Sequence, residues 1–163
     1  MTKLKAGQKA PDFSLLDTNG NNVKLSKLKG KNVVLYFYPR DNTPGCTKEA
    51  CSFRDEFPKI KAKNTVVLGV SMDNQESHKK FAEKFALPFA LLCDTKGDVC
   101  KKYDVYGLKS LYGRKFWGIK RTTFVIDENG IIKHVFENVK PEGHAKEVLK
   151  AITLVIAKSF LSV

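Results

Sequence analysis

The chain has 163 residues, 42% of them hydrophobic and 28% charged, which predicts a single globular domain, residues 1–163, with a core of its own. The net charge of +12 is compatible with a nucleic-acid partner, but the lysines are scattered along the chain as on a solvated surface. No apolar run predicts a signal peptide or a membrane span, so we expect a cytoplasmic protein that binds neither membranes nor nucleic acid.

The N-terminal half predicts a hairpin, a buried strand and a helix. Two short apolar runs flank Asn19 and Gly20, a common hairpin signal, and residues 32–39 read as a strand buried on both faces. A loop rich in turn-forming residues then leads into a helix that we expect to begin at Cys46 and to kink or end at Pro58. One buried stripe of this helix is expected to contain Cys46, Ala50, Phe53, Phe57 and Ile60.

The second half alternates strands and helices before two final strands. Residues 65–72 and 89–94 predict strands, and each is followed by a helical pattern, at 74–87 and 97–104. Two strands joined by a turn follow at residues 122–137, and Pro141 is expected to open a last amphipathic helix that ends near Lys158. This order predicts an α/β protein with one mixed sheet and helices on both faces.

Cys46 and Cys51 raise the main chemical question. On a regular helix their Cα atoms would be about 8.7 Å apart, beyond the roughly 7 Å that a disulfide allows. Cys46 opens the predicted helix, where unpaired N–H groups and the helix dipole stabilise a thiolate, so it is the candidate nucleophile and Cys51 the second thiol. The spacing is not that of a C-x-x-C redox pair.

The other cysteines and the histidines receive no catalytic role. Together with Cys46 and Cys51, Cys93 and Cys100 form a poor template for zinc, and we expect both of them to be packing residues. The three histidines show no spacing typical of metal ligands; they are His78, His134 and His144. We therefore predict no metal site and no cofactor.

The residues before Cys46 resemble a known active site. Residues 39–46, Pro-Arg-Asp-Asn-Thr-Pro-Gly-Cys, fit the Pro-x-x-x-Thr-x-x-Cys motif of peroxiredoxins, and a second cysteine five residues on is similar to the bacterioferritin comigratory protein, or peroxiredoxin Q, subgroup. Segments at 7–13, 33–39, 67–73 and 106–127 extend the match over most of the chain. The resemblance implies a thioredoxin-like fold with an added N-terminal β-hairpin.

The same resemblance implies a role for each site residue. Cys46 would be the peroxidatic cysteine, and Cys51 would resolve its sulfenic acid as an intramolecular disulfide, which a thiol reductant such as thioredoxin then reduces. Thr43 and Arg121 match the other polar positions of the site, Pro39 the residue that shields the thiolate, and Gly45 completes the substrate-binding set. We expect hydrogen peroxide and organic hydroperoxides to be the substrates. We also expect the protein to be a monomer.

Elementary chemistry supports these roles and adds a conformational requirement. Arg121 can hold the thiolate and the charge that develops on the leaving oxygen, and the Thr43 hydroxyl can orient the peroxide. Because Cys51 cannot reach Cys46 along an intact helix, the first helical turns must unwind in each cycle.

Two other classes of function stay open on the sequence alone. A thioredoxin-like disulfide oxidoreductase would carry a C-x-x-C motif, and a non-enzymatic basic binding protein would keep its activity after Cys46→Ser. Residues 106–121 interleave aromatic and basic side chains, as single-strand nucleic-acid sites do. We expect this stretch instead to be a loop over the pocket, with Phe116 and Trp117 shaping which hydroperoxides enter.

Overall fold

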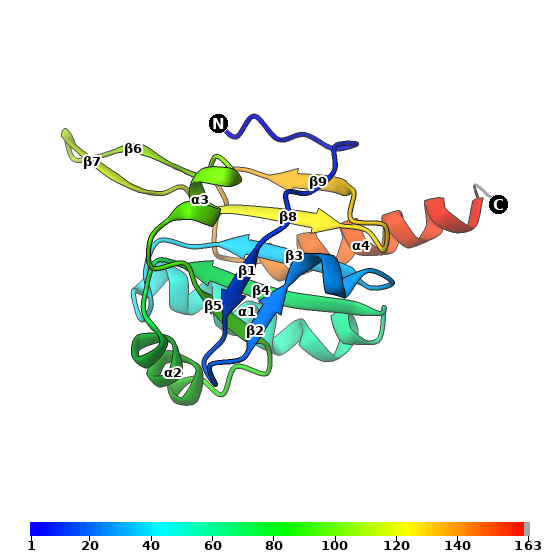
Figure 1. Ribbon diagram of the computed structural model, residues 1–163, viewed down its shortest axis with the longest axis horizontal. Coiled ribbons are helices and arrows are strands. Elements are labelled where there is room, and N and C mark those ends of the chain that lie inside the picture. Colours follow the sequence, from blue (N-terminus) through cyan, green and yellow to red (C-terminus); the bar gives the residue numbers. More distant parts are fainter. Residues whose placement is uncertain (162–163) are drawn as a thin grey trace.

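The computed structural model describes residues 1–161 and contains a seven-stranded mixed sheet in the order β2-β1-β5-β4-β3-β8-β9 (Figure 1). A separate two-stranded sheet pairs β6 with β7. The strands are β1 (Ser14–Leu16), β2 (Asn22–Lys24), β3 (Asn32–Phe37), β4 (Thr65–Ser71), β5 (Ala90–Cys93), β6 (Tyr106–Leu111), β7 (Arg114–Ile119), β8 (Thr122–Ile126) and β9 (Ile132–Phe136). The helices are the short 3-10 helix η1 (Leu25–Leu28), α1 (Pro44–Lys61), α2 (Gln75–Lys84), α3 (Asp98–Lys102) and α4 (His144–Leu161).

Strand β3 lies at the centre of the sheet and is buried at every position, as its continuous apolar sequence predicts. It runs parallel to β4 and antiparallel to β8. Its side chains alternate between two cores: Val33 and Leu35 contribute to one, Val34 and Tyr36 to the other. Helices α1, α2 and α4 cover the second core, whereas the N-terminal segment, η1 and α3 cover the first. The predicted α/β architecture with helices on both faces is therefore confirmed.

The N-terminal hairpin is also confirmed. Leu15 of β1 pairs with Val23 of β2, and the turn between them is fixed by the Asp17 carboxylate, which accepts hydrogen bonds from two backbone N–H groups. The hairpin joins the main sheet where Leu16 lies opposite Cys93 of β5.

Helix α1 differs from its prediction at both ends. It begins at Pro44, two residues earlier than expected, because proline at the first helical position has a suitable φ and needs no hydrogen-bond acceptor for its nitrogen. Pro58 does not end the helix, which continues to Lys61. Since Pro58 stands only three residues from that end, its missing N–H removes a single intrahelical hydrogen bond near the terminus.

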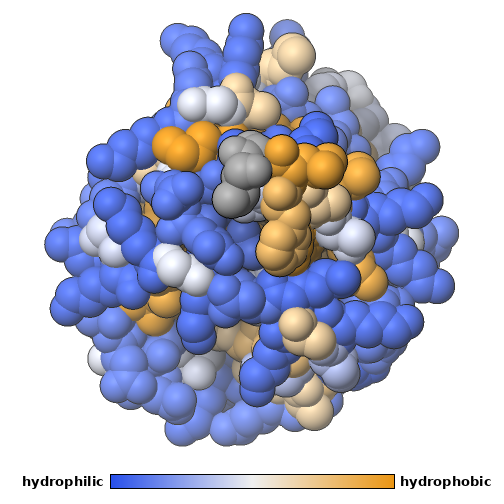
Figure 2. Space-filling view, turned by 90° about the vertical axis from the view of Figure 1, so that its right-hand side faces the viewer, coloured by the Kyte–Doolittle hydropathy of each residue, from blue (hydrophilic) through white to orange (hydrophobic). Residues whose placement is uncertain are grey.

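Helix α4 begins at His144, three residues after the expected Pro141, and extends to Leu161. Its C-terminal part reaches beyond the body of the sheet (Figure 1). Figure 2 faces this end of the molecule and shows apolar side chains gathered on an otherwise hydrophilic surface. The exposed apolar residues of α4 are Leu154, Phe160 and Leu161. No helix among residues 1–161 is long and apolar enough to cross a bilayer.

The expectation that residues 106–121 form a loop over the pocket is wrong. Residues 106–119 form the β6–β7 hairpin, which projects away from the sheet (Figure 1). Its two-residue turn, Tyr112 and Gly113, has positive φ at both positions (51° and 77°), which favours the right-handed twist of a tight hairpin. The side chains of Phe116 and Trp117 are 42% and 66% exposed on this projection, so they do not form a lid over Cys46.

Candidate active site

Cys46 occupies the first turn of α1, at the end of the sheet where β3 finishes. Its side chain is buried, with 2% of its surface exposed, and the thiol is free. Thr43 caps the helix with extended backbone angles, but its hydroxyl donates to the Arg40 carbonyl oxygen at 3.0 Å and makes no capping bond. Cys46 therefore lies in the first helical turn, where N–H groups without helical partners carry a partial positive charge.

Arg121 reaches Cys46 from a distant part of the chain. It immediately precedes β8, whose first residue, Thr122, pairs with Phe37 at the end of β3. This register places Arg121 Nη2 3.4 Å from Cys46 Sγ. Burial opposes the charge of the guanidinium, but Glu49 and Cys46 outweigh it and raise the pKa of Arg121. The sulfur thus faces a permanent cation.

Glu49 completes this group and was missed by the sequence analysis. Its Oε1 accepts from Arg121 Nη1 at 2.8 Å, and the side chain is fully buried. Its Oε2 has no hydrogen-bond partner among residues 1–161; His144 Nε2 is 4.0 Å away. Burial raises the pKa of Glu49 to about 7, although Arg121 opposes the shift. The available signal was its position three residues after Cys46, on the same face of the helix.

Gly45 borders the same group. A Cβ atom at Gly45 would lie 3.2 Å from Arg121 Nη2, tighter than almost all such contacts in proteins. Gly45 therefore gives the guanidinium room to approach Cys46. Pro39 is half-buried at the start of the loop that leads to α1.

The remaining cysteines differ in exposure and in acidity. Cys51 is half-buried on the same unbroken helix as Cys46, and both are free thiols. Cys93 lies on β5, where burial and nearby acids, Asp41 first, raise its pKa to about 11. Cys100 is fully buried on α3, and burial together with Asp94 raises its pKa far above the ordinary value. Both environments disfavour a thiolate, in agreement with packing roles.

A buried polar cluster fixes the loop before Thr43, and its histidine, His78, carries no signal of this role in the sequence. His78 Nε2 is 2.8 Å from the Leu92 carbonyl oxygen, and its Nδ1 is 2.7 Å from Asp41 Oδ2. Asp41 also accepts from the hydroxyls of Tyr38, at 2.6 Å, and Ser77, at 2.8 Å. The loop is thus tied to α2 and β5.

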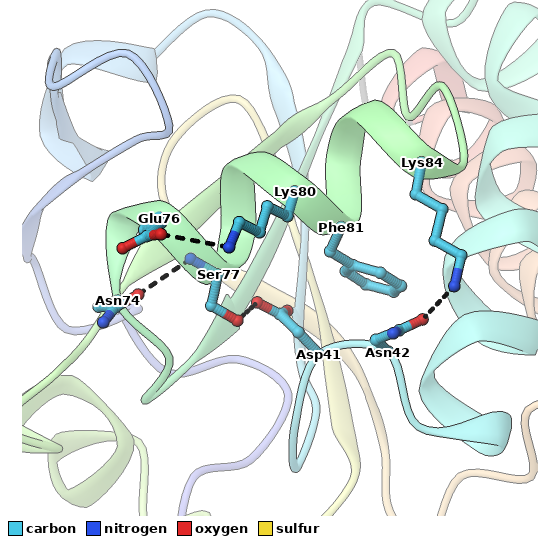
Figure 3. Close-up of a pocket in the computed structure, with 8 residues that line it drawn as sticks. All are labelled: Asp41, Asn42, Asn74, Glu76, Ser77, Lys80, Phe81 and Lys84. Carbon is cyan, nitrogen blue, oxygen red and sulfur yellow. Dashed lines mark hydrogen bonds and ion pairs between the residues drawn. The ribbon is translucent and has the colours of Figure 1, made fainter.

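Figure 3 shows the outer side of this cluster, where the loop and α2 enclose a hollow of about 340 Å³. Ser77 points toward Asp41, and Lys84 reaches across to Asn42, whose Oδ1 is 3.4 Å from the ammonium. Asn42 has a positive φ of 59°, a conformation that asparagine tolerates better than most residues. The hollow borders the loop but is not lined by Cys46.

Comparison with known proteins identifies the family. The model of the AhpC/TSA family matches residues 6–135. The chain belongs to the AhpC/TSA family. Peroxiredoxin Bcp of Bacillus subtilis is 46% identical over 91% of this chain and 95% of its own length, and peroxiredoxin Bcp of Escherichia coli is 45% identical over 91% and 96%.

Solved structures agree with this assignment. The bacterioferritin comigratory protein of Xanthomonas campestris, described in connection with alkyl peroxide reduction, superposes with a TM-score of 0.86 at 34% identity, over 92% of this chain and 98% of its own. The chain is therefore a peroxiredoxin of the bacterioferritin comigratory protein, or peroxiredoxin Q, group, with a thioredoxin-like fold. It is a thiol-dependent peroxidase, an oxidoreductase that consumes peroxide and needs a thiol reductant. The disulfide oxidoreductase and non-enzymatic alternatives are set aside.

Proposed function

We propose that Cys46 is the peroxidatic cysteine. One observation carries this assignment: the Cys46 sulfur is buried at the start of α1, 3.4 Å from Arg121 Nη2. The Cys46 thiolate attacks the nearer oxygen of the peroxide, forming an S–O bond while the O–O bond breaks. The leaving oxygen takes the electron pair and then a proton from water, and Cys46 is left as a sulfenic acid. Arg121 stabilises the anionic charge on sulfur before the attack and on the leaving oxygen during it.

The other site residues are proposed to bind and orient the substrate. The Thr43 hydroxyl directs its proton to Arg40, so its oxygen is available to accept a hydrogen bond from the peroxide O–H. Gly45 leaves space for Arg121, and Pro39 limits the access of water. Both hydrogen peroxide and organic hydroperoxides are proposed substrates, supported by the alkyl peroxide reduction associated with the Xanthomonas relative.

Cys51 is proposed to resolve the sulfenic acid. Its thiol displaces water from the Cys46 sulfenic acid, giving an intramolecular disulfide, and a dithiol protein of the thioredoxin class then reduces that disulfide through its own oxidation. Cys93 and Cys100 are poorer candidates because their surroundings disfavour the thiolate. We also propose that residues 1–163 act as one domain, as a monomer, in the cytoplasm, where four free thiols suit reducing conditions.

Rapid mixing of reduced protein with hydrogen peroxide or an organic hydroperoxide tests the assignment. Wild-type protein should consume one equivalent in a fast phase, and Cys46→Ser should not, because a serine hydroxyl is hardly ionised at neutral pH. Thiol-dependent peroxidase activity that survives in folded Cys46→Ser would refute the assignment. The ratio of the two peroxide rates in wild-type protein ranks the substrates.

A further inference from the structure

The β6–β7 hairpin exposes several large apolar side chains. It projects from the body (Figure 1), and five of its large hydrophobic side chains are at least 42% exposed. They are Leu108, Leu111, Tyr112, Phe116 and Trp117. A two-stranded hairpin alone is marginally stable in water, and apolar groups gathered on one are typical of a binding surface.

The register of the hairpin arranges these side chains on both faces. Leu108 lies opposite Trp117, and the Trp117 ring stacks on Tyr106 with centroids 6.0 Å apart, so these three side chains share one face. On the other face Lys109 lies opposite Phe116, with its ammonium 5.8 Å from the ring centroid. Trp117 is therefore supported on one side by Tyr106 while two thirds of its surface stays open, as in an aromatic anchor of an interface.

The hairpin is also uniformly basic. Residues 105–126 contain five lysines and arginines and no aspartate or glutamate. One of the five, Arg121, belongs to the active site, and the other four are Lys109, Arg114, Lys115 and Lys120. A partner of this surface must combine an apolar centre with acidic surroundings, because like charges placed opposite these residues would be repelled.

The base of the hairpin adjoins Cys46. The Lys120 N–H donates to the Val105 carbonyl at 2.7 Å and closes the base one residue before Arg121. Lys109 Nζ donates to the Ile119 carbonyl oxygen at 2.9 Å. Burial and the charge of Arg121 lower the pKa of Lys109, and Cys46 opposes this shift, so the Lys109 ammonium interacts electrostatically with the active site. In contrast, the exposed apolar residues of α4 lie at the opposite end of the molecule (Figures 1 and 2).

We propose that the β6–β7 hairpin is the docking surface for the protein reductant, a thioredoxin-class dithiol protein whose contact face is apolar with acidic residues around it. The inference rests on the proposed function, since the docked dithiol attacks the Cys46–Cys51 disulfide at the base of the hairpin. One thiolate of the reductant breaks that disulfide and forms a mixed disulfide, and its second thiol then displaces the enzyme's cysteine, so two electrons pass to the enzyme.

The test compares a protein reductant with a small one. Peroxide turnover is measured with increasing concentrations of a bacterial thioredoxin, recycled by thioredoxin reductase and NADPH, and separately with dithiothreitol. Trp117→Ala should raise the KM for thioredoxin about tenfold or more by removing an anchor. Lys115→Glu should raise it several-fold at low salt, with the difference shrinking at high salt because the attraction is screened. Neither substitution should change turnover with dithiothreitol.

Matched controls come from helix α4, outside the β6–β7 hairpin. Phe160→Ala removes an aromatic side chain of α4 that is 79% exposed, and Lys146→Glu reverses an exposed charge of the same helix. Both variants should match wild-type protein with either reductant. Circular dichroism and thermal melting confirm that each variant is folded.

Three results would overturn the proposal. The first is a thioredoxin KM unchanged in Trp117→Ala and Lys115→Glu, and the second is a wild-type protein that turns over with dithiothreitol but not with thioredoxin. The third is binding of wild-type protein, but not of these variants, to phosphatidylglycerol vesicles or single-stranded DNA, with the thioredoxin KM unaffected. Failure of the proposed function itself is distinguishable, because dithiothreitol would then support no turnover in wild-type protein.

Discussion

Glu49 Oε1 accepts a hydrogen bond from Arg121 Nη1 at 2.8 Å, while the other terminal nitrogen of Arg121 faces Cys46 Sγ. The guanidinium that serves the sulfur is thus anchored by a residue of the same helix, located between the two cysteines. A change in the first turns of α1 must therefore alter the thiol site and the ion pair together.

Arg121→Ala should slow the reaction with peroxide by about 100-fold or more, as the loss of a donor to a developing oxyanion does in other enzymes. The measurement is single-turnover consumption of hydrogen peroxide by reduced protein. Arg114→Ala removes an exposed arginine of the β6–β7 hairpin and is the matched control, with an unchanged rate expected. If Arg121→Ala consumed peroxide at a rate within about threefold of wild-type protein, the role of Arg121 would be structural only.

Glu49 should make the opening of α1 dependent on pH. Burial raises its pKa to about 7 in the closed helix, against an ordinary value of 4.5, so between these limits the closed form binds more protons than the opened form. The closed form is therefore most stable at low pH and loses that stabilisation as the pH rises toward 7, with the opening equilibrium growing up to about tenfold per pH unit. Burial lowers the pKa of neighbouring His144, which disfavours the charged form of its ring.

Hydrogen exchange of residues 46–52 in reduced protein, corrected for intrinsic rates, measures this dependence. Glu49→Gln keeps an acceptor for Arg121 but cannot ionise, so its opening equilibrium should be nearly flat between pH 4.5 and 7. Parallel pH profiles for wild-type protein and Glu49→Gln would show that another group controls the opening.

Cys51→Ser should separate the two half-reactions. The Cys46 site remains complete, so one equivalent of peroxide is still consumed quickly. The sulfenic acid then persists or is oxidised further to sulfinic acid, because no nearby thiol traps it. Intact mass after one and ten equivalents of peroxide records both products. Normal cycling of this variant with thioredoxin would instead assign resolution to Cys93, Cys100 or a second chain.

Oxidation should remove helix locally. In the reduced protein α1 is continuous from Pro44 to Lys61, and two cysteines five residues apart on such a helix are about 8.7 Å apart at Cα, too far for a disulfide. Amide protection should therefore be lost over residues 46–52 of oxidised protein and retained in α4. Equal protection in both states, with the Cys46–Cys51 bond verified by mass, would contradict this prediction.

The sequence predicts those parts of the fold whose pattern follows from local burial. The continuous apolar run of β3 and the Asn-Gly signal of the N-terminal hairpin are examples. The β6–β7 hairpin was missed because its aromatic and basic residues are exposed on both faces and show no alternation of polar and apolar positions. A tight turn led by a tyrosine with positive φ carries no common sequence signal either.

The candidate site, too, was only partly predictable from the sequence. Cys46, Cys51, Thr43 and Arg121 could be proposed from a motif, and the structure brings Arg121 to Cys46 through the β3–β8 register. Glu49 has one signal, its position on the Cys46 face of the helix, but a buried acid contradicts the usual pattern of charged residues on the surface. The Asp41–His78 pair joins a loop to a helix across 37 residues, and only the fold makes it a neighbour of the site.

Helix α1 buries very different side chains along its length. Before Phe53 it buries only Cys46, Glu49 and Ala50, whereas Phe53 is fully buried and its ring stacks on Tyr36 with centroids 4.7 Å apart. The few carbon atoms that Cys46 and Ala50 bury contribute only about 2 kcal/mol, at roughly 0.8 kcal/mol per methylene. The reactive end of the helix can therefore melt and reform while Phe53 and the aromatic core around it stay packed, so each catalytic cycle disturbs only a small part of the hydrophobic core.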